Sequence, residues 1–192
     1  MGQGQLTFDG VACRRGGRIL FEGLSFALGQ GEAAIVSGPN GIGKSSLLRL
    51  AAGLLLPAAG EISRTGRVGL ADEALALDRH LPLAHALGFW AGLDGGSVLP
   101  ALEAVSLTHL RQVPVRMLST GQRKRASLAR LVASKANVWL LDEPGNGLDT
   151  PSLAQLSSLI ARHRAEGGIT LIASHQPLGI DGALAIRLGE GA

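Results

Sequence analysis

The fold of this 192-residue chain is decided by Gly38-Pro39-Asn40-Gly41-Ile42-Gly43-Lys44-Ser45, which fits G-x-x-x-x-G-K-[ST], the pattern of a phosphate-binding loop. Such a loop turns backbone N–H groups toward phosphate oxygens, and the following helix adds partial positive charge at its N-terminus. The pattern assigns Lys44 to the β- and γ-phosphates and the Ser45 hydroxyl to Mg²⁺. We therefore predict a nucleotide-binding site made of Gly38, Pro39, Asn40, Gly41, Ile42, Gly43, Lys44, Ser45 and Ser46.

The residues on both sides of this loop support the prediction. Ala33–Ser37 is a short apolar run that suits a buried strand, and Leu47, Leu48 and Ala51 carry helical spacing just after the loop. The alternative is a Gly-rich turn with a chance Lys-Ser pair. All four fixed positions match within a strand, a loop and a helix, and this favours the phosphate-binding loop.

The composition is that of a globular protein of about one domain. Hydrophobic residues make up 46% and charged residues 17%, and the single cysteine, Cys13, excludes an internal disulfide framework. The start of the chain lacks the regions of a signal peptide, and no run of about 18 apolar residues could cross a bilayer. A net charge of +3 is a modest imbalance, so no nucleic-acid partner is expected. We expect the protein in the cytoplasm or on the cytoplasmic face of a membrane.

The remaining pattern predicts an α/β fold with a mainly parallel core sheet. Residues 6–28 read as antiparallel strands with a turn at Gly16-Gly17, and the segment 81–116 is mostly helical, broken by Gly95-Gly96 and Pro100. Residues 1–192 are predicted to form a single domain with a helical insert at about 78–134. Further strands are expected at residues 60–62, 67–70, 138–141, 169–173 and 183–188, and an amphipathic helix from Pro151.

Two carboxylates follow the predicted strand at 138–141. Ligands of parallel α/β sheets collect at the carboxyl ends of strands, where the phosphate-binding loop also sits. Asp142 is therefore predicted to hold Mg²⁺ opposite Ser45, and Glu143 to polarise the water that attacks the γ-phosphate. His175 follows the next strand and is predicted to donate a hydrogen bond to the γ-phosphate or to this water. The alternative for the carboxylate pair is a solvated acidic turn.

A third motif points to a family. Leu118-Ser119-Thr120-Gly121-Gln122 resembles the L-S-G-G-Q signature of ATP-binding-cassette (ABC) ATPases, with Thr120 in place of the first glycine. Asn146–Asp149 resembles the D-loop of the same family. The resemblance spans residues 6–188 and implies a P-loop NTPase of the ABC ATPase type that uses ATP and Mg²⁺. It also implies that two copies enclose two ATP molecules, each bound by one copy's phosphate loop and by Ser119, Gly121 and Gln122 of the other.

Three cations follow this signature, Arg123-Lys124-Arg125, in the first turn of the predicted helix. They would oppose the helix dipole unless an anion were nearby. The nucleotide of a second subunit would be such an anion. A solvated basic helix start is the alternative for two of the three.

Within the family, the chain resembles the ATP-binding subunits of haem exporters in bacterial cytochrome c maturation. This similarity rests on the stretch 20–26, on the small third residue of the signature and on His175-Gln176-Pro177-Leu178. It implies a peripheral protein on the cytoplasmic face of the inner membrane. It also implies a multi-span permease and other cytochrome c maturation components as partners. Hydrolysis would drive either haem transport or release of a haem-loaded chaperone.

Two positions depart from the family pattern. ABC ATPases usually place a Gln after the strand near Gly69, and the nearest match here is Glu73. The aromatic residue that usually stacks on adenine is absent near Arg15, whose guanidinium is an alternative stacking group.

Other functions remain compatible with parts of this pattern. The chain could energise export of another cargo, such as a lipid, a drug or a metal. A soluble ABC ATPase acting on DNA or ribosomes is a third alternative, although such chains usually carry two cassettes or a long coiled coil. A module that holds nucleotide without turnover is opposed by the intact set of Lys44, Asp142, Glu143 and His175.

Overall fold

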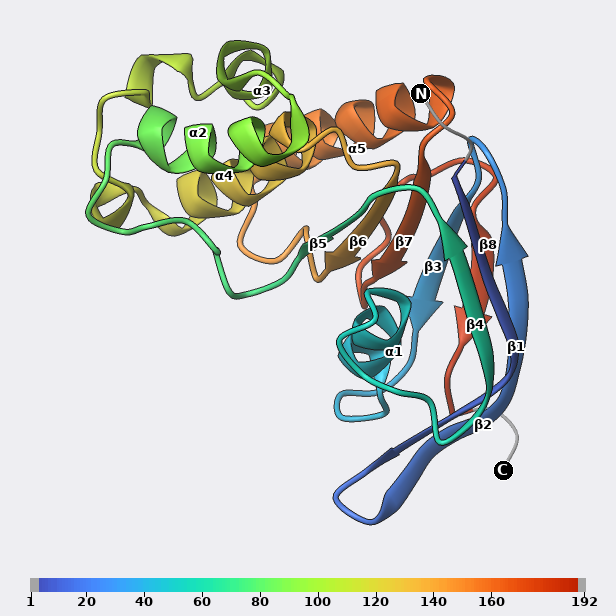
Figure 1. Cartoon of the computed structure of the whole chain (residues 1–192). Coiled ribbons are helices and arrows are strands. Elements are labelled where there is room, and N and C mark those ends of the chain that lie inside the picture. Colours follow the sequence, from blue (N-terminus) through green and yellow to red (C-terminus); the bar gives the residue numbers. More distant parts are fainter. Residues whose placement is uncertain (1–3, 190–192) are drawn as a thin grey trace.

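The computed structural model describes residues 4–189, so the predictions made for the first three and last three residues lie outside the described part. It contains two sheets and a group of helices that projects from one end of the larger sheet (Figure 1). The strands are β1 (Gln5–Arg15), β2 (Arg18–Leu28), β3 (Ala33–Ser37), β4 (Ala59–Thr65), β5 (Val68–Ala71), β6 (Val138–Asp142), β7 (Ile169–Ala173) and β8 (Leu184–Arg187). The α-helices are α1 (Lys44–Ala51), α2 (Leu83–Asp94), α3 (Val98–Ala104), α4 (Thr120–Ala133) and α5 (Thr150–Ala165).

The larger sheet is parallel and has the strand order β5-β6-β7-β3-β8. Its central strands are apolar without alternation and buried along their length, because helices cover both faces of such a sheet. The predictions of buried strands at 138–141 and 169–173 and of an edge strand at 183–188 are confirmed. The structure thus confirms the predicted α/β class.

The smaller sheet is antiparallel, with the order β2-β1-β4. The predicted turn at Gly16-Gly17 joins β1 to β2, and the rings of Phe8 and Phe26 stack across the pair at 4.6 Å between centroids. Cys13 is buried in the core that this sheet shares with α1 and the parallel strands.

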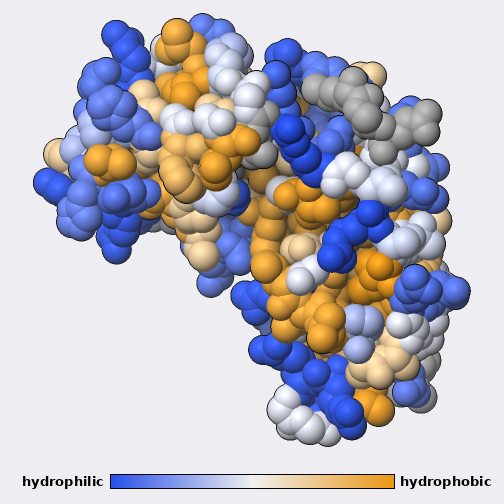
Figure 2. All heavy atoms as spheres, in the orientation of Figure 1, coloured by the Kyte–Doolittle hydropathy of each residue, from blue (hydrophilic) through white to orange (hydrophobic). Residues whose placement is uncertain are grey.

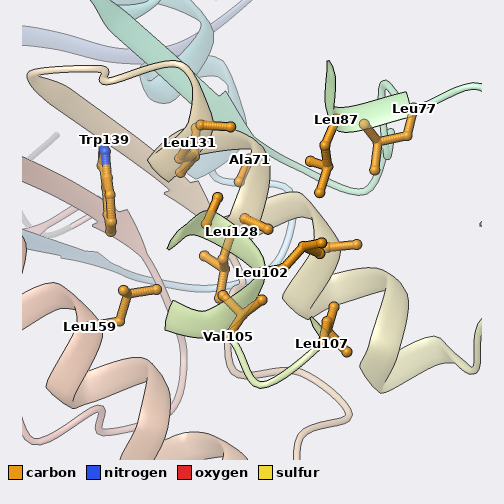
Figure 3. Packing of buried hydrophobic residues seen from close by; sticks show 14 of the residues in the cluster. Ala71, Leu77, Leu87, Leu102, Val105, Leu107, Leu128, Leu131, Trp139 and Leu159 are labelled. Atoms are coloured by element: carbon orange, nitrogen blue, oxygen red, sulfur yellow. The ribbon is translucent and has the colours of Figure 1, made fainter. Parts of the chain in front are cut away.

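The helical part lies between β5 and β6 in the sequence. It contains α2, α3, two short 3₁₀ turns at Thr108–Leu110 and Val115–Met117, and α4. Its apolar core joins these helices to β6 and α5, and Figure 3 shows Leu102, Val105 and Leu128 packed together within it. The domain boundaries stay a prediction, but the helices fall within the stretch proposed as an insert.

One predicted helix break is wrong. Gly95 does end α2, in a left-handed conformation with φ 66°, but Pro100 lies inside α3. It occupies the third position of that helix, where the backbone N–H that proline lacks would have had no intrahelical acceptor. Proline is therefore tolerated there.

Exposed apolar side chains occur in both parts of the chain. They include Leu54, Leu56, Phe89 and Leu93, and Figure 2 shows hydrophobic residues gathered on the face that carries α1. Within the described part of the chain, none of the helices combines the length and the apolar composition needed to cross a membrane.

Gly96 should be irreplaceable where the α2–α3 connection meets the end of α4. A Cβ at Gly96 would overlap the carbonyl oxygen of Ala133, which is backbone and cannot turn aside. Gly96→Ala is expected to destabilise the protein by about 1–3 kcal/mol, the usual cost of overpacking. Urea unfolding followed by circular dichroism measures this change.

The control is Gly92→Ala within α2, where a Cβ would meet nothing within 4 Å. That change should be neutral or stabilising by about 0.5–1 kcal/mol, because alanine favours a helix over glycine. Equal effects of the two substitutions would contradict the packing argument.

Candidate nucleotide-binding site

Three parallel strands bring the predicted site residues together. β3 leads into the phosphate-binding loop, β6 into Asp142 and Glu143, and β7 toward His175. The pairings Val36 with Ala173 and Asp142 with Ala173 place the carboxyl ends of these strands side by side (Figure 1). The predicted convergence at one edge of the sheet is therefore confirmed.

The loop encloses a cavity of about 320 Å³ at the start of α1. Gly38 has φ 140°, and a Cβ there would come within 2.7 Å of the Leu188 carbonyl oxygen. Gly43, the N-cap of α1, has φ 118° and is backed by Leu20 and Phe21. Both positions therefore need glycine, as the motif indicated. The cavity is lined by Leu20, Asn40, Gly41, Gly43, Lys44, Ser45, Ser46, Asp142 and Glu143.

Lys44 is held inside the loop. Its side chain is buried, and its Nζ donates to the carbonyl oxygens of Gly38 at 2.7 Å and Pro39 at 3.1 Å. At the start of helix α1, no N-cap side chain accepts a hydrogen bond from the first backbone N–H groups. A fixed ammonium beside a helix N-terminus suits a phosphate group.

Asp142 and Ser45 offer oxygen ligands at the same cavity. Burial raises the pKa of the Asp142 carboxyl above its ordinary value, and the nearby Glu143 acts in the same direction, whereas a hydrogen bond from the Ser45 hydroxyl opposes this. A carboxylate and a hydroxyl are ligands that Mg²⁺ accepts. No group of three His, Cys, Asp or Glu side chains in residues 4–189 is arranged to hold a metal ion by itself.

Glu143 has a strained backbone and a histidine partner. Its φ is 47°, a left-handed conformation that costs a residue with a Cβ roughly 1–3 kcal/mol. Its N–H donates to the Ala173 carbonyl at 2.9 Å, and its Oε2 lies 2.8 Å from Nδ1 of His175. The carboxylate is thus held between the two strand ends. The His175–Glu143 contact supports a shared role for the two residues, which were predicted separately.

Glu73 and Arg15 are the two positions at which the sequence departs from the family pattern. Glu73 lines an adjoining cavity of about 390 Å³ together with Ser45, Asp142 and Glu143. A carboxylate therefore lies beside Ser45 and Asp142, the residues predicted to hold Mg²⁺. ABC ATPases usually have the amide of a Gln at this place. Arg15 lies at the end of β1, beside the hairpin turn.

The signature residues lie at the start of α4 and do not line the cavity around Lys44. Ser119 caps the helix: its hydroxyl accepts from the Gln122 N–H at 3.2 Å, and the Gln122 side-chain oxygen accepts from the Ser119 N–H at 2.8 Å. A Cβ at Gly121 would meet nothing within 4 Å, so this position is open to a close approach. Their contact with nucleotide stays a prediction that needs a second copy of the chain.

Each of the three cations behind the signature donates to a group of its own chain. Lys124 Nζ donates to the Glu143 carbonyl at 2.7 Å, Arg125 Nη1 to the Val105 carbonyl at 3.2 Å, and Arg123 Nη2 to the Thr120 hydroxyl at 3.4 Å. An approach of a second subunit's nucleotide to this cluster stays a prediction. Lys124 was missed as a residue of the site because no sequence spacing links it to Glu143.

Comparison with known families identifies this arrangement. The family model described as ABC transporter matches residues 21–146. The chain belongs to the ABC transporter family. It is accordingly an ATP-binding and ATP-hydrolysing subunit that works with membrane subunits in an ABC transporter.

The chain is similar to curated members of this family over most of its length. It is 57% identical to a protein of Sphingopyxis alaskensis over 91% of this chain and 92% of that protein, and 56% identical to one of Zymomonas mobilis over 92% and 81%. Both are named cytochrome c biogenesis ATP-binding export protein CcmA. Among solved structures, an ABC transporter ATP-binding protein from Pyrococcus furiosus, itself described as putative, has a TM-score of 0.84 at 25% identity and covers 96% of this chain and 97% of its own.

The Asp142 carboxylate should lower the stability of the folded protein and strengthen the binding of Mg²⁺-ATP. Because its pKa is raised in the folded state, the ionised carboxylate destabilises the protein at pH values above that pKa. Without nucleotide at pH 8, Asp142→Asn should unfold at the same or a higher temperature, and the difference should shrink as the pH falls. Loss of a charged ligand should weaken Mg²⁺-dependent ATP binding by about tenfold or more.

Thermal unfolding at pH 8 and pH 5 and fluorescence titration with ATP, with and without Mg²⁺, measure both effects. Asp9→Asn, at an exposed position on β1, is the control and should change neither. An Asp142→Asn protein that binds Mg²⁺-ATP normally would contradict the assignment of Asp142.

Proposed function

We propose that this chain hydrolyses ATP at the site formed by Lys44, Asp142, Glu143 and His175, and that the hydrolysis energises an export system for c-type cytochrome biogenesis. The observation that supports the chemistry is the Glu143–His175 contact at the sheet edge that also holds the Lys44 loop. The name shared by relatives up to 57% identical supports the pathway.

The residues present divide the chemistry between them. In the proposed site, residues 38–46 cradle the triphosphate with backbone N–H groups, and Lys44 supplies positive charge to the β- and γ-phosphates. Ser45 and Asp142 would hold Mg²⁺. When bound, this ion would neutralise part of the negative charge of the phosphates. The Glu143 carboxylate accepts the proton of the attacking water. His175 fixes the orientation of that carboxylate through Nδ1 and leaves its other nitrogen free to face the γ-phosphate.

Two copies of the chain form the working unit in this proposal. Each copy places Ser119, Gly121 and Gln122 at the nucleotide held by the other. Arg15 stacks on the adenine in place of an aromatic side chain. The pair sits on the cytoplasmic face of the bacterial inner membrane, bound to a multi-span permease and, through it, to other cytochrome c maturation components.

Haem is the proposed cargo, handled by the membrane partner rather than by this chain. The sequence has no C-x-x-C-H motif, and its one cysteine, Cys13, is buried. ATP hydrolysis would then drive haem transport or the release of a haem-loaded chaperone.

Glu143→Gln separates binding from hydrolysis. The amide keeps the size of the side chain but cannot accept a proton, so ATP affinity should stay within about twofold while turnover falls by about 10²–10⁴-fold. With ATP bound and not consumed, the two copies should elute together in size-exclusion chromatography. Phosphate release and equilibrium binding are the measurements.

The matched control is Glu166→Gln, an exposed carboxylate at the end of α5 that pairs with Arg162. It should hydrolyse ATP at the unsubstituted rate. If Glu143→Gln does so too, Glu143 is not the base and the proposed mechanism fails.

Purification of the full-length chain from detergent-solubilised native membranes tests the pathway. We expect a multi-span permease and cytochrome c maturation components to be retained, as identified by mass spectrometry. If a permease for lipids, drugs or metals is retained instead, the proposal that haem is the cargo is wrong. Ribosomes or DNA in place of any membrane protein would overturn the transporter assignment.

A further inference from the structure

Lys124 connects the signature helix to the catalytic loop of the same chain. It lies in the first turn of α4, and its Nζ donates to the Glu143 carbonyl oxygen at 2.7 Å. The two residues are 19 positions apart and belong to different parts of the fold, the helical part and the parallel sheet. Neither the phosphate-binding loop nor the signature motif explains this contact.

The surroundings of Lys124 act on its charge in opposite directions. Burial lowers the pKa of Lys124, while the carboxylates of Glu73, Glu143 and Asp142 oppose that change. Lys124 and Glu73 also line one cavity of about 400 Å³. Among the described residues, Lys124 is thus a cation that faces the carboxylates of the proposed metal and water site from the helical side.

The backbone of Glu143 needs such an anchor. Its left-handed conformation is unfavourable in isolation, and three hydrogen bonds hold it. The N–H of Glu143 donates to Ala173, and its carbonyl accepts from the Asn146 N–H at 3.2 Å and from Lys124. Of these three hydrogen bonds, the one from Lys124 is charge-assisted, and its donor lies on helix α4. The direction of the Glu143 side chain toward His175 follows from this backbone geometry.

We propose that Lys124 is a positioning residue for ATP hydrolysis, which holds the peptide of Glu143 so that its carboxylate faces the attacking water. This proposal rests on the role of Glu143 in the proposed function. It further implies that movement of α4, the helix that carries the signature, reaches the base of its own chain directly. The carboxylate of Glu73 opposes the lowering of the Lys124 pKa that burial causes.

Lys124→Met tests the proposal in the complex purified with its membrane subunits. Methionine preserves the apolar stem but removes the donor and the charge. We expect kcat for ATP to fall by about tenfold or more, because a small misplacement of a catalytic group is costly. The KM and the equilibrium affinity for ATP should stay within about twofold, and Lys124→Arg, which keeps a cationic donor, should recover part of the rate.

Lys135→Met is the matched control, since Lys135 is exposed and lies just beyond the other end of α4. It should leave kcat unchanged. Thermal unfolding of each variant reports whether it is folded. Should Lys124→Met not fold, Lys124→Leu, which also lacks a donor, replaces it with the same expected loss of kcat.

A double-mutant cycle with Glu143→Gln distinguishes positioning from a general structural effect. If Lys124 acts through Glu143, adding Lys124→Met to Glu143→Gln should change the residual turnover by less than about twofold. A further tenfold loss in that background, or full activity of Lys124→Met alone, would overturn the proposal for Lys124. Full activity of Glu143→Gln would instead overturn the proposed function beneath it.

Discussion

The parallel alignment of β3, β6 and β7 is the constraint on which the rest of the structure depends. Since the three strands run in one direction and pair in register, the residues that follow them must emerge at one edge of the sheet. The chain thereby places a phosphate-binding loop, two carboxylates and a histidine together, although more than 130 positions separate the first from the last. The buried apolar strands set the geometry, and the polar residues after them supply the chemistry.

The edge also concentrates charge, and the fold balances that charge with few cations. Asp142 and Glu143 are adjacent, and Glu73 lies at the neighbouring cavity. Lys44 is bound within the phosphate-binding loop by carbonyl oxygens, whereas Lys124 reaches the carboxylates from the helical part. In the proposed site, Lys44 serves the nucleotide and Lys124 the loop that carries Glu143, while Arg49 lines the cavity beside Glu73.

Much of this arrangement could be read from the sequence because it is local. The loop pattern and the strand-end carboxylates depend on residues close together in the chain, and each was predicted. The left-handed backbone of Glu143 and the contact from Lys124 could not be, since both depend on how α4 packs against the loop after β6. The prediction that Pro100 breaks a helix was wrong for a related reason. The effect of a proline depends on its position within the helix, and the start of α3 was not evident from the sequence. The helical part and the sheet meet through tertiary contacts that no spacing in the sequence encodes.

The capping box at the start of α4 has a consequence for recognition across two chains. The Ser119 oxygen is used as an acceptor by the Gln122 N–H, but its own hydroxyl proton is not committed by that bond. The side chain can therefore donate to an incoming phosphate without giving up the cap. Because Gln122 closes the box from the other side, the helix start is already in its final shape before a second chain arrives. In the proposed pair of chains, this helix start is therefore preformed, and association requires no folding step there.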